Sequence, residues 1–469
     1  MNAHTNIVLQ QAEPKTHAPE IPWSDWREFS YEDIPGLAGE LYKETESRAS
    51  RSLPKASLAG TIQMLCMAAG RGKLKTHTGG KVNLITYTAA PSAAGKENPQ
   101  HMIKSLAYNL GWLRSMSNSP RSDKTIVLDF IEEKAEGCMV YVVDEAHQFL
   151  RAMSSSKASE YTQAMLTTIL SITGSAIYPI SSTTARELRK ECRDRRKELA
   201  REAQRLDKAA GSGTPVEAEQ KELDKQAREI ERIEKTLDVG LHDVHCNAFL
   251  SSTISELGRE INTSTIESGL LGRSLFFLCG EERARLNQDA KGYDMISMRG
   301  ITNKLAGIQN GGRIVTLSDS GRAALAGVLE WVEDDLHRND ATIGALYSRS
   351  YQRISSLAAL FAAGDDYVID EEHVRAAFAI DMQSMSDMTS MLKQNEAEGP
   401  AEMIEVRIIQ ALSDKPLGIA ASTLKQGATK PKDIAKACQK DPNLYQGVIG
   451  GLIERQAIVQ DGSRYKLRR

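Results

Sequence analysis

Short apolar runs alternate with amphipathic stretches through the first 280 residues of the chain. Four runs are typical of buried strands, and they lie at 82–88, 138–143, 247–252 and 273–279. Helical patterns occupy 54–70, 99–116 and 122–136. Strands that alternate with helices predict an α/β unit with a mainly parallel sheet.

A charged segment without aromatic residues separates the second and third predicted strands, over 183–238. Its apolar positions recur every seven residues, at Cys192, Leu199 and Leu206 and again at Leu223, Ile230 and Leu237. Gly211 to Pro215 interrupt the two series. This pattern predicts an inserted antiparallel coiled-coil hairpin. It is either a solvated arm that contacts a neighbouring subunit or a DNA contact, because 186–208 holds ten basic and six acidic residues.

The remaining chain divides at changes of pattern. We expect an N-terminal arm and docking segment over 1–50, with the first 20 residues flexible, and an α/β core over 51–315. A helical unit follows over 316–398. In the last unit, 399–469, we expect three helices, over 401–414, 421–440 and 443–458, and then two strands around Asp461-Gly462. Three helices followed by a β-hairpin resemble a winged helix.

Composition fits a multidomain chain of 469 residues with 41% hydrophobic and 26% charged residues. The formal charge of −3 excludes a basic coat protein or a histone-like protein, and it argues against a wholly acidic disordered chain. The balance is uneven, because residues 401–469 carry twelve Lys and Arg against seven Asp and Glu, a charge of +5. A basic unit of this kind favours DNA over a protein partner. The expected phosphate contacts are Lys430, Lys432, Lys436, Lys440, Arg464, Lys466 and Arg468.

The six cysteines show no CxxC pair, so neither a disulfide framework nor a zinc site is expected. We find no signal peptide pattern and no apolar run long enough to cross a membrane, which predicts a cytoplasmic protein without membrane contact.

The first predicted strand continues into a small-residue loop, Pro91-Ser92-Ala93-Ala94-Gly95-Lys96-Glu97. With Ala90, this loop is similar to the phosphate-binding pattern G-x-x-x-x-G-K-[ST] in its strand–loop–helix setting. Backbone N–H groups of such a loop face the phosphates of ATP, and Lys96 would neutralise them. Ala90 stands at the first glycine and Glu97 at the hydroxyl that usually binds Mg²⁺, a role that the Glu97 carboxylate would take.

Acidic and hydroxyl residues follow the next two strands. Asp144 and Glu145 end the strand at 138–143, where the first would hold Mg²⁺ and the second would activate the attacking water. Ser251, Ser252 and Thr253 end the third strand, where a hydroxyl, with Ser252 and Thr253 preferred, would sense the γ-phosphate or merely cap a helix. Arg273 precedes the fourth strand and would reach the nucleotide of a neighbouring subunit. Arg349 and Arg353 are further possible phosphate contacts.

Five segments in this order resemble a poorly characterised P-loop ATPase family of phages, prophages and mobile elements, related to AAA+-like replicative helicases and primase–helicases. These segments are LPKASLAGTIQMLCMAAGRG, VNLITYTAAPSAAGKENPQ, VYVVDEAHQFL, FLSSTISEL and ESGLLGRSLFF. The resemblance covers about 30–390. It implies an AAA+-like core with a helical lid over 316–398 and ATP and Mg²⁺ as cofactors. It also implies roles for Lys96, Asp144, Glu145 and Arg273 in binding, metal ligation, hydrolysis and trans-activation. Ala93 departs from the usual glycine, and no primase half is present.

Three functions fit these observations. The first is an ATP-driven DNA translocase, the replicative helicase of a phage or mobile element, which acts in a bacterial host as a ring, with a hexamer favoured. The second is an ATP-switch initiator or helicase loader that binds DNA, and replication proteins, without unwinding. The third is a non-enzymatic DNA-binding assembly protein. The Asp144–His147 sequence DEAH also occurs in helicases with two paired RecA-like domains, but this chain shows no second domain of that kind.

Overall fold

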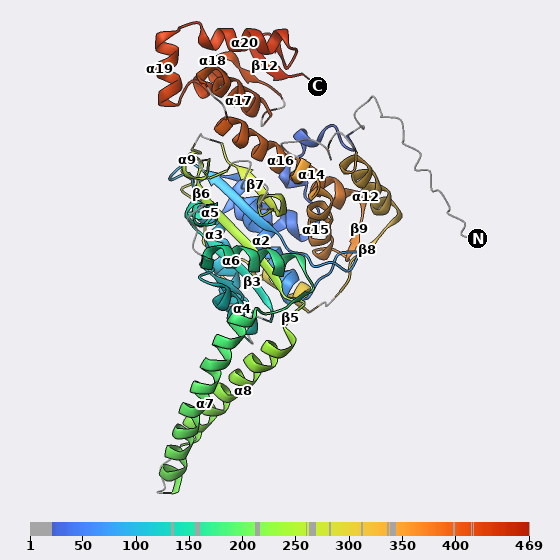
Figure 1. Ribbon diagram of the computed structural model, residues 1–469. Helices are drawn as coiled ribbons and strands as arrows, with labels where there is room; N and C mark the ends of the chain where they lie inside the picture. The colour runs from blue at the N-terminus through green and yellow to red at the C-terminus, as the bar shows by residue number, and fades with distance from the viewer. Residues whose placement is uncertain are drawn as a thin grey trace, which may run out of the picture.

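The computed structural model describes residues 21–132, 136–154, 160–211, 216–258, 260–261, 269–280, 283–310, 313–334, 337, 344–396, 399–413, 415 and 417–468. Its centre is a parallel five-stranded sheet in the order β2-β3-β6-β1-β7 (Figure 1). The strands are β1 (Ile85–Ala90), β2 (Met116–Ser117), β3 (Cys138–Val143), β6 (His245–Thr253) and β7 (Ser274–Leu278). The predicted α/β class with a parallel sheet is therefore confirmed. The predicted flexible arm at 1–20 lies outside the described residues.

Both faces of the sheet are covered by helices. Along β3, Val140 and Val142 enter one hydrophobic core, whereas Met139, Tyr141 and Val143 enter the other, as the two-residue repeat of a strand requires. The first face is covered by α1 (Gly36–Ser47), α2 (Pro54–Arg71), α3 (Glu97–Asn109), α11 (Arg299–Gln309), α12 (Asp319–Val332) and α15 (Ser350–Ala363). The second is covered mainly by α4 (Asp123–Ile131) and α6 (Glu160–Gly174). The long α16 (Glu371–Glu396) contributes to both cores.

Helix α2 lies directly against the sheet. It begins at Pro54, where a missing N–H costs nothing, and its residues from Ala56 to Arg71 are buried. A Cβ at Gly70 would stand 2.5 Å from Cys138 Sγ, so only glycine permits this close approach. The helix predicted over 54–70 is thus confirmed as a central packing element.

The predicted helix over 99–116 is wrong in its second half. Helix α3 ends at Asn109 because Gly111 adopts φ +71, and the N–H groups of Gly111 and Trp112 close a Schellman motif on Tyr108 and Ala107. A 3-10 turn at Leu113–Ser115 then leads into the edge strand β2. The helix predicted over 122–136 is shorter, since α4 starts after the Ser122 cap and ends at Ile131.

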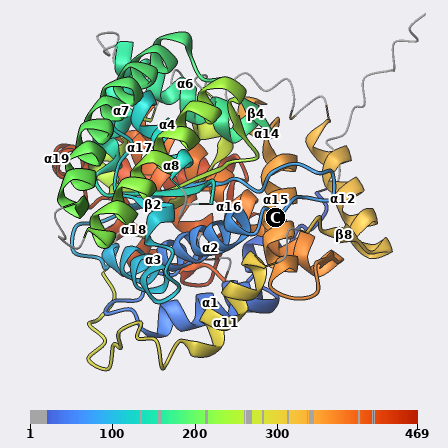
Figure 2. The same cartoon turned by 90° about the horizontal axis from the view of Figure 1, so that it is seen from below.

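The inserted hairpin is confirmed. Helices α7 (Ser182–Gly211) and α8 (Glu217–Val239) pack side by side and project from the body (Figure 1). Their buried seam contains the predicted heptad residues, with Leu199 half-buried. The connection at 212–215 lies outside the described residues. A two-stranded neck, β4 (Ile177–Tyr178) and β5 (Leu241–His242), joins the hairpin to the body, and Figure 2 shows the hairpin on the side of α4 and α6.

Helices α12, α15 and α16 pack into the same core as the first part of the chain. Strands β8 (Thr316–Leu317) and β9 (Val368–Ile369) pair beside α12, and Trp331 of α12 meets Phe378 of α16 edge to face. Trp23 also contacts Phe378, and Trp26 is buried nearby in the same core. The N-terminal segment therefore docks onto the later helices. Short elements complete the body: 3-10 turns at Trp26–Glu28 and Tyr31–Asp33, α5 (Ala146–Ser154), α9 (Ile254–Gly258), a 3-10 turn at Leu271–Arg273, and α14 (Gly344–Tyr347).

The C-terminal unit has its own hydrophobic core and lies beyond α16 (Figure 1). Its helices are α17 (Pro400–Ser413), α18 (Ala421–Ala428), α19 (Lys432–Lys440) and α20 (Leu444–Glu454). A three-stranded antiparallel sheet in the order β10-β12-β11 completes it, with β10 at Ile419–Ala420, β11 at Ile458–Asp461 and β12 at Arg464–Leu467. The expectation of three helices is wrong, because Pro431 starts a new helix where a continuous one was predicted. The two terminal strands around Gly462 are confirmed.

Candidate functional site

Three loops meet at the carboxyl edge of the sheet. Strand β6 lies between β1 and β3, with Thr253 level with Ala90 and Leu250 level with Val143. Because all three strands run parallel, the residues that follow them emerge on one edge. Ligands of open parallel sheets bind at this edge. The loop at 91–96, the pair at 144–145 and the end of β6 are therefore neighbours.

The loop after β1 curls so that its backbone donors are left open. Ala93 has φ +60 and Gly95 φ +100, both in the left-handed region. Within the described chain, no hydrogen bond uses the N–H of Ser92, Ala93, Gly95 or Lys96 as a donor. The loop leads directly into the N-terminus of α3, where Glu97 is the first residue. Free N–H groups at a helix N-terminus form a site for an anion.

Lys96 joins this loop to the end of β3. Its Nζ donates a hydrogen bond to Asp144 Oδ1 at 3.0 Å, and its side chain is 10% exposed. The Ser251 hydroxyl donates to the same oxygen at 2.9 Å, and Gln100 Nε2 on α3 donates to Ser251 Oγ at 2.9 Å. Burial alone would raise the pKa of Asp144, but the hydrogen bonds from Lys96 and Ser251 outweigh it and lower that pKa. Asp144 is held as a carboxylate.

Glu145 is exposed and held in a strained backbone. Its φ is +54, unusual for a residue with a side chain, and its carboxylate accepts a hydrogen bond from Gln148 Nε2 at 2.5 Å. Its N–H donates to Asp144 Oδ1 at 3.0 Å. Backbone strain of this kind concentrates at functional sites.

The hydroxyl beside Asp144 is Ser251, one residue before the pair predicted to contact the nucleotide. Ser252 instead shares a hydrogen bond with His147 Nδ1 at 2.9 Å. Thr253 donates to Glu256 Oε2 at 2.6 Å, the local bonding of a helix start. Gln100 is the site residue that the sequence prediction missed. Gln100 had a signal, because it lies four residues after Lys96 and so one turn further along α3.

Glu97, predicted as a metal ligand, is exposed at the first turn of α3. Within the described parts of the chain, its carboxylate has no hydrogen bond and no ion pair. A negative charge at this position interacts favourably with the helix dipole. The carboxylate is thus available at the same edge as Asp144, although it does not contact it.

Arg273 lies at the opposite end of the sheet, where the strands begin. It precedes β7, whose first residue, Ser274, is level with Ile85 at the start of β1. Five further residues along β1 cover about 17 Å, so Arg273 is far from Lys96 of its own chain. Its Nη1 donates to the Gly269 carbonyl at 3.0 Å, and burial and then the nearby Arg349 lower its pKa.

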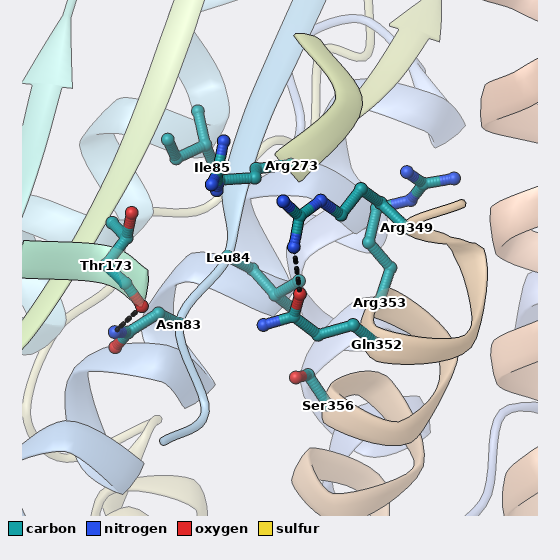
Figure 3. A pocket seen from close by; sticks show the side chains of 9 residues that line it. All are labelled: Asn83, Leu84, Ile85, Thr173, Arg273, Arg349, Gln352, Arg353 and Ser356. Carbon is teal, nitrogen blue, oxygen red and sulfur yellow. Dashed lines mark hydrogen bonds between the residues drawn. The ribbon is translucent and has the colours of Figure 1, made fainter. Parts of the chain in front are cut away.

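Figure 3 shows three arginines around a small cavity at this end of the sheet: Arg273, Arg349 and Arg353. Arg353 is buried and donates to both carboxylate oxygens of Asp381, at 2.5 and 3.1 Å, and to the Gly272 carbonyl. Its expected role as a phosphate contact is wrong, because these bonds make it a structural link between α15 and α16. Arg349 is half-buried and lies beside Arg273, away from Lys96.

The predicted DNA contacts fall into two groups in the C-terminal unit. Lys432, Lys436 and Lys440 are exposed and follow one face of α19, with Lys430 just before it. The second group lies on the final strand. Arg464 is exposed, Lys466 pairs with Asp461 at 2.8 Å, and Arg468 donates to Gln456. The structure therefore brings the lysines together along α19.

The chain matches no protein-family model, and no curated protein has significant sequence similarity to it. Among the described helices, none is both long and apolar enough to span a membrane. The described residues contain no cluster of three or more His, Cys, Asp or Glu side chains placed to hold a metal ion. All six cysteines are described, and each is a free thiol.

Proposed function

We propose that this protein is an ATP-driven DNA translocase, the replicative helicase of a phage or mobile element, which works in the cytoplasm of a bacterial host. The observation that carries the proposal is the linkage of Lys96, Asp144 and Ser251 beside a loop of open backbone donors. An anion-binding loop, a lysine and a carboxylate at one sheet edge are the parts that phosphoryl transfer requires.

The residues at this edge fit ATP with Mg²⁺. The N–H groups of the P-loop, 91–97, and the Lys96 ammonium would hold the phosphates. Asp144 and Glu97 offer carboxylate oxygens for Mg²⁺, which when bound supplies charge neutralisation to the triphosphate. When ATP and Mg²⁺ bind, the Lys96–Asp144 hydrogen bond would break, so that Lys96 contacts a phosphate and Asp144 contacts the metal. Glu145, exposed beside them, would orient and deprotonate the attacking water.

The placement of Arg273 supports a ring, with a hexamer favoured. Arg273 lies level with the start of β1, and the length of β1, about 17 Å, separates it from the loop that follows this strand. It would therefore act on the nucleotide of a neighbouring subunit. ATP sites would then lie at subunit interfaces. The helices over 316–398 would form the lid of the AAA+-like core, with which α12, α15 and α16 share a hydrophobic core.

The C-terminal unit supports DNA binding. Its β10-β12-β11 order, with α17, α18 and α20 around it, supports a winged helix, in which α19 would be an added helix that carries the lysine row. Its charge of +5 would attract the phosphate backbone. Replication proteins of the host or element remain possible further partners.

One observation favours the second candidate, an ATP-switch initiator or helicase loader. Glu97 occupies the place of the metal-binding hydroxyl, and a carboxylate near the triphosphate would slow turnover. A switch of this kind would bind ATP and DNA, hydrolyse slowly and leave a duplex intact. The third candidate, a DNA-binding assembly protein, would show DNA binding without any effect of ATP.

Binding of ATP and its hydrolysis by the purified chain, compared with Lys96→Ala, test the proposal. We expect Lys96→Ala to reduce hydrolysis at least about 100-fold, which corresponds to loss of about 3 kcal/mol of transition-state stabilisation. Lys104→Ala, two turns further along α3, is the matched control and should retain wild-type activity. Equal rates in all three proteins would show that the loop is not an ATPase site.

A further inference from the structure

The outer face of α7 carries a straight row of basic side chains. Arg186, Lys190, Arg193, Lys197, Arg201 and Lys208 are all exposed. Their spacing of i, i+4, i+7, i+11, i+15 and i+22 keeps them on one face of the helix. The one intervening position of this series, i+18, is Gln204, and the acidic residues of α7 lie on its flanks. We call these six residues the α7 basic row.

The basic row lies away from the seam that holds the hairpin together. The buried residues Leu188, Cys192 and Leu206 face α8, on the opposite side of α7. Arginines that flank the seam are used within the hairpin: Arg189 pairs with Asp238 at 2.9 Å and Arg196 pairs with Glu234. The row is therefore not needed to hold α7 against α8.

Most of the row has no partner in the protein. Lys197 pairs with Asp194 at 3.2 Å. For the other five, no ion pair or hydrogen bond of the side chain exists among the residues that the structure describes. Near the neck, Arg186 and Arg193 also line a hollow of about 550 Å³ beside α8. The two acidic residues that line this hollow, Glu234 and Asp238, already pair with Arg196 and Arg189. Five of the six side chains of the row therefore form a cationic surface without an ion pair among the described residues.

We propose that the α7 basic row binds the phosphate backbone of duplex DNA, independently of sequence. The row extends over 22 residues, about 33 Å of helix, which is close to one turn of B-DNA at about 34–36 Å. Lysine and arginine that neutralise phosphates supply the sequence-independent part of DNA affinity. A rigid, straight row of this length would lie along one face of the duplex over about one turn and meet phosphates where the two strands cross that face.

Other occupants fit the row less well. Binding of single strands uses aromatic side chains on which bases stack, and 183–238 contains none. A membrane-surface helix needs an apolar face open to lipid, but that of α7 is buried against α8. An acidic protein surface has the right charge, and it is the alternative that the experiment must separate.

This inference goes beyond the proposed function, which assigns DNA contacts to the C-terminal unit and none to the hairpin. Figure 1 shows the hairpin and the C-terminal unit at opposite ends of the molecule, so the two surfaces are separable by mutation. The row would give the protein a second, remote contact on the duplex. It does not depend on ATP hydrolysis.

The test uses the full chain and a labelled 30-bp duplex of arbitrary sequence, with affinity measured by fluorescence anisotropy over a range of salt. The row variant carries Arg186→Gln, Arg193→Gln, Arg201→Gln and Lys208→Gln. The control variant removes four positive charges from exposed positions of α8, with Lys221→Gln, Lys225→Gln, Arg228→Gln and Lys235→Gln. A 30-nucleotide oligo-dT strand is the second probe.

We expect the row variant to bind the duplex at least about tenfold more weakly, with a salt slope smaller by about 3–4, since each phosphate contact contributes about 0.9. The α8 control should stay within about twofold, as should oligo-dT binding by either variant. The double variant Arg193→Gln/Arg201→Gln should reduce the slope by about 2, which is half of the reduction expected for the quadruple variant. It replaces the quadruple variant if circular dichroism shows misfolding of the latter.

Unchanged duplex affinity and slope in the row variant would overturn the proposal and leave an acidic protein as the partner. Equal losses in the row and α8 variants would overturn it as well, because they would reflect net charge alone. Neither result bears on the proposed function, which Lys432→Gln/Lys436→Gln/Lys440→Gln and the ATPase rate of Lys96→Ala report separately.

Discussion

Lys96 Nζ lies 3.0 Å from Asp144 Oδ1, so the loop after β1 and the end of β3 are joined by one charged hydrogen bond across the intervening strand β6. Ser251, at the end of β6, completes the link. Three segments that are up to 155 residues apart in the sequence thereby form one site. Every prediction about catalysis below depends on this arrangement.

Ser251→Ala tests the positioning of Asp144. Hydrogen bonds to charged groups contribute about 1.5–3 kcal/mol, so we expect kcat for ATP hydrolysis to fall about tenfold or more. The lost bond also raises the pKa of Asp144. Because the carboxylate form is the active one, the acidic limb of the pH–rate profile should move to higher pH.

Ser251→Thr keeps the hydroxyl and is the control for this measurement. It should restore both the rate and the position of the acidic limb. If the profile of Ser251→Ala coincides with that of the wild type, Ser251 has no part in holding Asp144.

Arg273→Ala tests the action of one subunit on the next. An arginine that stabilises transition-state charge in trans contributes about 10³-fold or more to kcat, so the variant alone should be nearly inactive. Mixing Arg273→Ala with Lys96→Ala should restore part of the activity, because some interfaces then combine an intact loop with an intact arginine.

Two results would contradict a role of Arg273 in trans. Absence of any recovery, in mixtures shown by mass to contain both variants in one oligomer, would place Arg273 outside the reaction. Near-wild-type activity of Arg273→Ala alone would do so as well.

Arg353→Met tests the structural assignment of that arginine. Removal of one partner leaves Asp381 as a buried, unpaired charge, which costs about 3–5 kcal/mol. The urea midpoint of unfolding should fall accordingly. Arg349 is half-buried and lies at the N-terminus of the same helix, α15. Arg349→Met should change the free energy of unfolding by less than about 1 kcal/mol. Equal effects of the two substitutions would contradict the assignment.

His245 makes stability depend on pH. It is fully buried at the start of β6, neither ring nitrogen has a hydrogen-bond partner in the described structure, and burial lowers its pKa to about 3. The unfolded chain takes up this proton below about pH 6.5 while the folded chain does not, so stability falls as the pH drops below that value. At pH 5 the loss from this group is about 2 kcal/mol.

His245→Leu removes the titrating group and one unsatisfied buried ring. The difference in unfolding free energy between pH 7.5 and pH 5 should shrink by about 2 kcal/mol relative to the wild type. A difference of unchanged size would show that other groups cause the pH dependence.

The sequence was sufficient where the signal is local. The hairpin follows from two heptad series, and the four main strands follow from short apolar runs beside a phosphate-binding pattern. Strand β2 could not be predicted, because two residues become a strand only through pairing with β3. The break between α18 and α19 had a local signal, Pro431, that the expected continuous helix ignored.

The site was predicted in outline and missed in detail. Lys96, Asp144 and Glu145 come from motifs of adjacent residues. The choice of Ser251 over Ser252 depends on which side of β6 faces β3 and the loop, which needs the register of the folded sheet. Arg353 was misassigned because its partner, Asp381, lies on another helix 28 residues away. The basic row was visible only as a charge count until the helix face and the ion pairs were known.

The most direct measurement of the central claim is ATP hydrolysis with and without single-stranded DNA, together with strand separation on a forked duplex. The account predicts that DNA stimulates hydrolysis, that the fork is separated only with ATP, and that Glu145→Gln abolishes both while ATP still binds. Slow hydrolysis that DNA does not stimulate, with the fork intact and Glu145→Gln indistinguishable from the wild type, would contradict it.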